Sequence, residues 1–222
     1  NSLNIREFYR DINGVTWVAM DVGLAMLEYP SSETLFKFKS KNLSFKSFSR
    51  FHSNLYVASD AGLWKLNQDN SGGEFFSKVP GIDHKIWKID SIAGKLLIAT
   101  EFGLYSMNAD ESMSLLISGV VTGFSFSKYN PRMIYIFRQN GIMLVNIVDG
   151  NFIIKDIFPE FIARTRNVVE ISPTEIWLDT DWTELWKINF AKVEDFNSFT
   201  GGSLQKIDTS NNLPEKRGLI YA

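Results

Sequence analysis

Cysteine is absent from this chain of 222 residues, and histidine is scarce. The lack of cysteine excludes disulfide bonds, zinc–cysteine sites and thiol nucleophiles. The two histidines, His52 and His84, lie 32 residues apart, whereas a metal site needs three or four converging ligands. We therefore expect no metal site and no cofactor.

Long apolar runs and a strong charge of either sign are also missing. No apolar stretch is long enough to cross a bilayer, so we expect no membrane contact by this segment. The formal net charge is −2, without the clustered Lys and Arg that nucleic-acid binding needs. The short basic stretch 37–46 is expected on the solvated face of an outer strand. No signal peptide follows Asn1, which leaves the compartment of the parent protein open.

Aromatic residues, by contrast, are abundant, with 18 Phe, 7 Tyr and 6 Trp. These residue types fit pleated, half-buried strands. With 45% apolar and 22% charged residues the chain is globular, and its helix signals are weak. The segment 189–199 is expected to be either a short helix or a long connection between strands. The composition therefore favours an all-β fold.

One pattern recurs five times: a short apolar strand, a tight turn, Gly-Leu or a close relative, and a second short strand. The aligned aliphatic residues are Leu24, Leu63, Leu104, Ile142 and Leu185. Their separations are 39, 41, 38 and 43 residues, which is typical of β-propeller blades. We predict an all-β propeller of about five four-stranded blades within a longer array. The repeats are expected at about 1–43, 44–84, 85–120, 121–164 and 165–212, with 213–222 starting a further blade.

The strands within a repeat follow from the turn signals. Those of the third repeat are expected at 85–91, 95–100, 103–107 and 113–118. The glycine before the aligned aliphatic residue is expected to provide the positive φ of a tight hairpin. In the fifth repeat Thr183-Glu184 replaces the glycine with one extra residue, which predicts a wider or bulged turn.

The repeat resembles the two-component regulator propeller family. A blade of that family reads roughly Asp-x-x-Gly, then Trp-Ile/Val-Gly/Ala-Thr/Ser, two variable residues and Gly-Leu. The first repeat matches at 11–14 and 16–24, and the second and third keep the later motif at 57–63 and 98–104. The fifth keeps Ile176-Trp177 and Thr180, and the fourth is degenerate, with Phe137 at the Thr position. The segment 211–222 resembles a blade link followed by another inner strand.

The resemblance implies a bacterial sensor region that lies in the periplasm or otherwise outside the cytoplasmic membrane, with its output domain elsewhere in the parent protein. The family shares no catalytic residues, so no catalytic role transfers. The expected partners are a small-molecule or oligosaccharide ligand, or a neighbouring propeller or sensor domain. An open end of the array would expose strand edges, which predicts cover by a neighbour, by residues outside this chain or by a homodimer.

Candidate binding residues come from the turn between the second and third strands of each repeat. Acids recur there, a pattern that suits either a solvated turn or a ring that binds a cation or sugar hydroxyls. Trp182 lies in the same turn of the fifth repeat, where it would either stack on a sugar ring or pack on a neighbouring blade. The candidate ligand-binding residues are Trp182, Asp181, Arg138, Glu101, Asp60, Asp21 and His84.

Three functions fit this sequence. The favoured one is a non-catalytic sensing or interaction module, because no nucleophile elbow, phosphate loop or EF-hand pattern occurs. The second is a propeller enzyme, either a lyase, a hydrolase or a quinone-dependent dehydrogenase, in which the candidate acids and His84 converge around an ion. The third is a purely structural scaffold. Fold alone does not choose among them.

Overall fold

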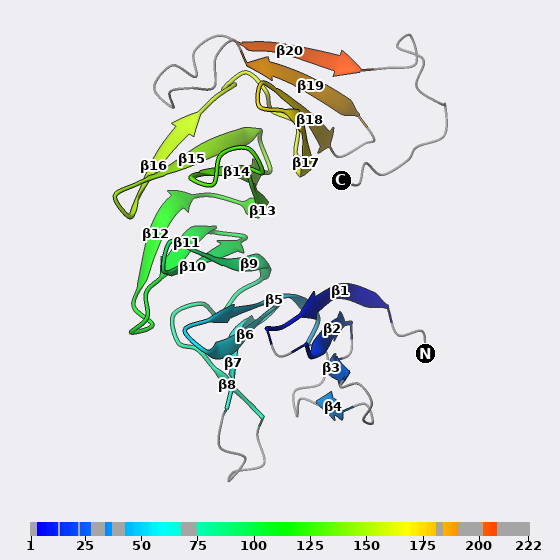
Figure 1. Cartoon of the computed structure of the whole chain (residues 1–222), viewed down its shortest axis with the longest axis vertical. Coiled ribbons are helices and arrows are strands. Elements are labelled where there is room, and N and C mark those ends of the chain that lie inside the picture. Colours follow the sequence, from blue (N-terminus) through cyan, green and yellow to red (C-terminus); the bar gives the residue numbers. More distant parts are fainter. Residues whose placement is uncertain are drawn as a thin grey trace. The chain divides into compact units, whose positions relative to one another are not determined.

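The computed structural model describes residues 4–12, 14–21, 23–27, 34–36, 43–67, 75–180, 184–190 and 202–207. Within these ranges the chain forms five four-stranded antiparallel sheets, each with its strands in chain order (Figure 1). We number the sheets as blades 1 to 5. The described residues form no helix, and hence none of membrane-spanning length. The predicted all-β class and four-stranded blades are confirmed.

Blades 1 to 3 belong to one compact unit that ends at Gly119. Blade 1 contains β1 (Ile5–Arg10), β2 (Thr16–Met20), β3 (Gly23–Leu27) and β4 (Thr34–Phe36). Blade 2 contains β5 (Phe45–Phe51), β6 (Asn54–Ser59), β7 (Gly62–Leu66) and β8 (Phe76–Lys78). Blade 3 contains β9 (Ile86–Ile92), β10 (Lys95–Thr100), β11 (Gly103–Met107) and β12 (Met113–Ser118).

Blades 4 and 5 belong to a second unit that begins at Val120. Blade 4 contains β13 (Val121–Phe126), β14 (Met133–Arg138), β15 (Ile142–Val148) and β16 (Asn151–Asp156). Blade 5 contains β17 (Thr165–Ser172), β18 (Glu175–Thr180), β19 (Leu185–Phe190) and β20 (Gly202–Ile207). In the segment 189–199 the first two residues complete β19, and the others lie outside the described residues, as does 213–222.

Apolar side chains fill the interfaces between neighbouring blades of a unit. The periodicity-two pattern of the strands places one face of each blade against the next. Trp17 of blade 1 packs with Phe45 and Phe48 of blade 2, and Ala58 of blade 2 packs with Ile89 of blade 3. In the second unit Tyr135 of blade 4 belongs to the same cluster as Val168 and Ile188 of blade 5. Four of the five aligned residues, Leu24, Leu63, Leu104 and Ile142, are buried, and Leu185 is half-buried.

A hydroxyl at the end of the second strand closes the following turn. The Thr100 hydroxyl donates to the carbonyl of Gly103 at 3.0 Å and accepts from the backbone N–H groups of Phe102 and Gly103. The Ser59 hydroxyl of blade 2 donates to Gly62 in the same way, and that of Thr180 in blade 5 donates to Glu184. The Thr/Ser position of the repeat therefore has a structural role.

The glycine that begins the third strand is needed mainly for space. A Cβ at Gly62, Gly103 or Gly141 would lie far inside van der Waals contact of a backbone carbonyl oxygen. Those oxygens belong to Ile82, Ile117 and Phe161. Gly62 and Gly141 also have positive φ, of 117° and 96°, but Gly103 does not. All three positions therefore require glycine because a backbone carbonyl approaches closely, and not because of the expected positive φ.

The turn of blade 5 is one residue longer than the others. Asp179 pairs with Leu185, whereas Ala99 pairs with Leu104 at the equivalent place in blade 3. The predicted wider turn is confirmed.

Buried carboxylates connect neighbouring blades within each unit. Asp11 of blade 1 accepts a hydrogen bond from Arg50 of blade 2 at 2.8 Å, and its second oxygen accepts from the backbone of Val15. Glu170 of blade 5 accepts three bonds from blade 4, which come from the Ser127 and Tyr135 hydroxyls and the Lys128 backbone N–H. Burial, followed by the contact with Glu170, raises the pKa of Tyr135 above its ordinary value.

Candidate functional site

The first strand of every blade contains a β-bulge at the same place, beside the turn that joins the second and third strands. In β1, for example, the pairing with β2 passes from Ile5 directly to Glu7. The other four first strands shift their register at the equivalent point. A bulge redirects a side chain and is common beside functional sites. The bulge residues are Arg6, Lys46, Trp87, Thr122 and Arg166.

In the first unit the bulges place Arg6, Lys46 and Trp87 on neighbouring strands. These residues come from β1, β5 and β9, and β5 contacts both of the other strands. Together with the turns between second and third strands they form what we call the rim of blades 1 to 3. The rim is the candidate functional site.

Three of the four predicted acids lie on this rim, but each interacts first with its own blade. Asp60 accepts a hydrogen bond from the backbone of Ser44 at 3.1 Å, and Glu101 accepts one from the backbone of Lys85 at 3.1 Å. In return, the backbone N–H of each acid donates to the carbonyl of the same residue. Asp21 contacts the Asn4 side chain in the equivalent way, at 3.0 Å. These carboxylates therefore close the blade by tying the turn to the start of the first strand.

Arg6 and Asp21 form a two-pronged ion pair. The guanidinium donates to both carboxylate oxygens of Asp21, at 2.6 and 2.9 Å. The hydrogen bonds from Arg6 and then Asn4 hold the pKa of Asp21 below its usual value, and the contact with Asp21 raises the pKa of Arg6. The pair orients the guanidinium at the rim while leaving it half exposed.

Lys46 lies between other cations. Its ammonium donates to the Ser44 hydroxyl at 2.7 Å. Burial lowers the pKa of Lys46, and the positive charges of Arg6 and Lys85 lower it further, against the opposing effect of Asp21 and Asp60. Positive charge from three successive blades thus gathers around this side chain.

Blade 3 adds aromatic groups to the rim. The Lys85 ammonium lies 3.5 Å from the centre of the Trp87 ring, which is cation–π geometry. His84 meets the exposed ring of Phe102 edge-on at 4.6 Å, and its Nε2 is buried without a hydrogen-bond partner in the described structure. Burial lowers the pKa of His84, so its neutral form is favoured. Phe102 occupies the same turn position in blade 3 as Trp182 in blade 5.

The remaining candidates belong to the second unit. Arg138 lies at the end of β14, where its backbone bonds with Gly141 and its Nε is buried without a partner among the described residues. The bulge residue Thr122 donates to the carbonyl of Thr165 at 3.1 Å, which connects blades 4 and 5. Asp181 and Trp182 lie outside the described residues.

The sequence analysis named none of the bulge residues. Lys46 was expected on an outer strand, and the structure corrects this, because it lies on the first strand β5. The signal that could have identified the bulge residues is their position in the blade. Each one directly follows the residue of the first strand that pairs with the last residue of the second strand.

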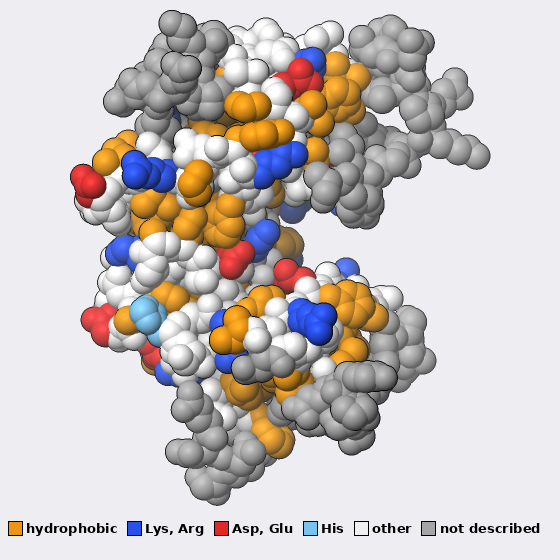
Figure 2. Space-filling model, viewed as in Figure 1, with side chains coloured by type: hydrophobic (Ala, Val, Ile, Leu, Met, Phe, Trp, Pro, Cys, Tyr) orange, Lys and Arg blue, Asp and Glu red, His pale blue; other side chains and the backbone are white. Residues whose placement is uncertain are grey.

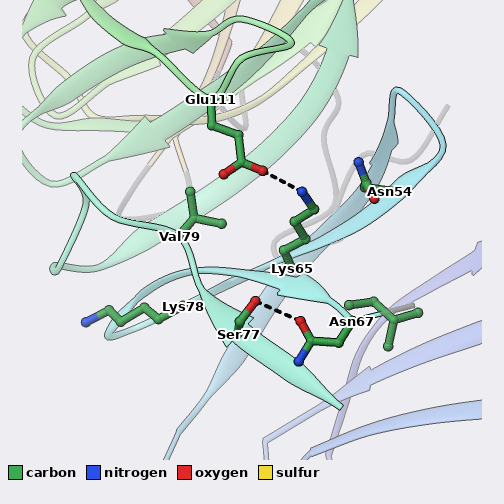
Figure 3. A pocket seen from close by; sticks show the side chains of 8 residues that line it. Asn54, Lys65, Asn67, Ser77, Lys78, Val79 and Glu111 are labelled. Carbon is green, nitrogen blue, oxygen red and sulfur yellow. Dashed lines mark hydrogen bonds and ion pairs between the residues drawn. The ribbon is translucent and has the colours of Figure 1, made fainter. Parts of the chain in front are cut away.

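An open groove of about 470 Å³ lies elsewhere in the first unit, across blades 2 and 3 (Figure 3). Its polar side chains mainly bind one another. Glu111 accepts from Lys65 at 2.7 Å and from Tyr56 at 3.0 Å, and Ser77 donates to Asn67 at 2.8 Å. The groove is therefore better explained as an inter-blade contact than as a ligand site.

Figure 2 shows one face, on which acidic and basic side chains are interspersed among apolar ones. Among the described residues, no three His, Asp or Glu side chains gather as metal ligands would. The arrangement suits recognition by hydrogen bonds and local charge.

No family model matches the chain, and no curated protein matches its sequence. Solved structures do match. The extracellular domain of the one-component system BT4673 from B. thetaiotaomicron shares 15% identity at a TM-score of 0.64, over 90% of this chain and 27% of that one. The extracellular domain of the hybrid two-component system BT3049 from the same organism shares 17% identity at 0.60, over 89% and 29%.

Streptogramin B lyase also matches, with 11% identity and a TM-score of 0.60 over 91% of this chain and 67% of the lyase. Of the two sensor chains named above, this chain spans less than a third of the length. The fold is that of β-propellers, including the extracellular domains of two-component sensors.

Proposed function

We propose that this chain is a recognition module of an extracytoplasmic bacterial sensor, which binds a ligand at the rim of its blades without converting it. The observation that carries the proposal is the bulge in every first strand, which delivers one side chain from each blade to equivalent places, with four residue types among the five blades. The structural similarity to extracellular sensor domains supports the proposed extracytoplasmic location.

The chemistry of the rim favours binding over catalysis. A propeller enzyme of the kind considered from the sequence needs acids that converge on a reacting group or an ion. Asp60 and Glu101 instead accept hydrogen bonds from backbone N–H groups at the start of their own blades, and Asp21 is paired with Arg6. Carboxylates held in this way orient neighbouring groups.

The test is a thermal-shift screen of the whole chain against neutral oligosaccharides, acidic oligosaccharides, amino acids, organic acids and nucleotides. A ligand that binds only the folded state raises Tm with its concentration. Each hit is then incubated with the protein and analysed by mass spectrometry. A hit recovered unchanged supports a recognition module, whereas a converted hit would establish an enzyme. No hit in any class would favour a structural scaffold.

A further inference from the structure

The rim of blades 1 to 3 brings cations together rather than separating them. Arg6 and Lys46 are bulge residues of neighbouring first strands, and Lys85 lies two residues before the bulge residue of the next. Like charges on adjacent strands raise the energy of a folded protein unless something else is gained. Their repetition on three successive blades therefore needs an explanation.

The described partners of the two ammonium groups are neutral. Lys46 donates to a serine hydroxyl, and Lys85 lies over an indole ring. An ammonium has three donors, so both groups retain capacity for another acceptor. The nearby carboxylates of Asp60 and Glu101 are fixed in their turns by backbone N–H groups.

Phe102 supplies an apolar contact beside these charges. It is 59% exposed in the turn that follows Glu101, and its ring rests edge-on against His84. An aromatic ring held in this way by a neighbour offers a rigid face at little entropic cost.

We infer that the rim of blades 1 to 3 binds an oxyanionic ligand, whose carboxylate or sulfate group contacts Lys46, Lys85 and Arg6 while an apolar face of the ligand lies against Phe102. This inference rests on the proposed function and names its ligand class. An anion would offset both effects that lower the pKa of Lys46, which are burial first and then the repulsion from Arg6 and Lys85. The ammonium and guanidinium groups would provide charge-assisted hydrogen bonds.

The experiment measures binding of two matched pairs of probes by titration calorimetry at low salt. Galacturonate oligomers are compared with galactose oligomers, and dextran sulfate with dextran. The variant Lys46→Gln/Lys85→Gln removes the charges at the rim. The control Lys128→Gln/Arg132→Gln makes the same change of net charge at exposed positions in blade 4. Circular dichroism checks that both fold, and Lys46→Gln alone replaces the double variant if it does not.

The expected result is that at least one anionic probe binds, that the rim variant weakens it at least tenfold, and that the control changes it less than twofold. Phe102→Ser should weaken the oligosaccharide further, and higher salt should weaken binding to the wild type. The two anionic probes distinguish carboxylate from sulfate. Equal weakening by both double variants would mean that only net charge matters, and would overturn the site.

Failure of this inference is distinguishable from failure of the proposed function. If neutral ligands alone bind, the rim does not select anions, but the chain is still a recognition module. If a probe binds equally to the wild type and the rim variant, the ligand site lies elsewhere. If neither class binds the wild type, the inference is overturned, whereas the proposed function is overturned only if the wider thermal-shift screen also gives no hit.

Discussion

At the scale of single residues, the space available limits which residue type several positions can hold, and it does so more strictly than chemical character does. The backbone carbonyl of Ile117 in β12 lies so close to Gly103 that a methyl group has no room. The neighbouring side chain of Leu115 lies on the same side and leaves no alternative direction. Well-packed interiors accommodate such insertions only by shifting the backbone.

We predict that Gly103→Ala destabilises the protein by about 1–3 kcal/mol. The methyl group would displace the start of β11 from the carbonyl of Ile117. Urea unfolding measures the effect, and Ser114→Ala on the exposed face of β12 is the control. An unchanged midpoint for Gly103→Ala would show that the close approach is absent in solution.

A second residue-scale prediction concerns Glu7 on β1. Burial raises the pKa of Glu7, and the nearby charge of Asp90 adds to this, whereas Lys88, the Ser47 hydroxyl and the backbone of Phe48 oppose it. An acid with a raised folded-state pKa binds its proton more tightly when folded, so its contribution to stability falls as pH rises above about 4.5.

Glu7→Gln should therefore stabilise the protein near neutral pH relative to the wild type, and the difference should shrink towards pH 4. Urea unfolding at a series of pH values measures it. The sign would be opposite if Lys88 dominated the environment of Glu7, because the wild type would then be the more stable form at neutral pH.

At the scale of elements, the sequence predicted strands well and bulges not at all. The strands 95–100, 103–107 and 113–118 were predicted at their observed bounds, because alternation and turn residues mark both ends. A bulge leaves no comparable mark. In Phe45-Lys46-Ser47 the extra residue reads as ordinary alternation, and only the pairing with β6 reveals that Lys46 is skipped.

The acids of the rim show the same limit. Their recurrence beside the turn was visible in the sequence, but their partners were not. Asp60 and Glu101 bind backbone N–H groups 16 residues earlier in the chain, a relation that exists only once the blade is folded. A recurring acid in a turn therefore indicates a repeated structure before it indicates a repeated function.

The contact between blades 4 and 5 supports an element-scale prediction. Glu170→Ala would leave two hydroxyls and one backbone N–H of blade 4 without their acceptor. Leaving a buried hydrogen-bond donor without its acceptor in this way costs about 1–3 kcal/mol. Hydrogen exchange should show faster exchange in blades 4 and 5, and Glu160→Ala, an exposed acid of the same unit, is the control. Unchanged protection in β17 would contradict the role of Glu170.

At the scale of the whole molecule, one face of blade 1 differs from its counterparts. Phe8 is 61% exposed, whereas the equivalent Phe48, Ile89 and Val168 are 4%, 1% and 8% exposed. Those three lie in the interfaces with the preceding blades. Phe8 thus lies on a face of the same kind as the inter-blade interfaces, but none of the described residues buries it.

We therefore predict that the chain self-associates with increasing concentration, and that Phe8→Lys raises the fraction of monomer. Burial of an aromatic side chain provides the driving force, and a lysine at its centre opposes it. Sedimentation velocity over a range of concentrations measures the effect. Leu115→Lys, which changes another exposed apolar residue, is the control. A monomeric wild type at all concentrations would contradict the prediction.

The bulges have a consequence for how such a protein changes over generations. A residue outside the regular pairing can be exchanged without altering the hydrogen bonds of its sheet, and four residue types already occur there in five blades, namely Arg, Lys, Trp, Thr and Arg. Four of the five preceding residues, Phe45, Ile86, Val121 and Thr165, are buried. Folding and specificity are thus assigned to adjacent but separate residues, and each duplication of a blade adds one further position at which selection can act.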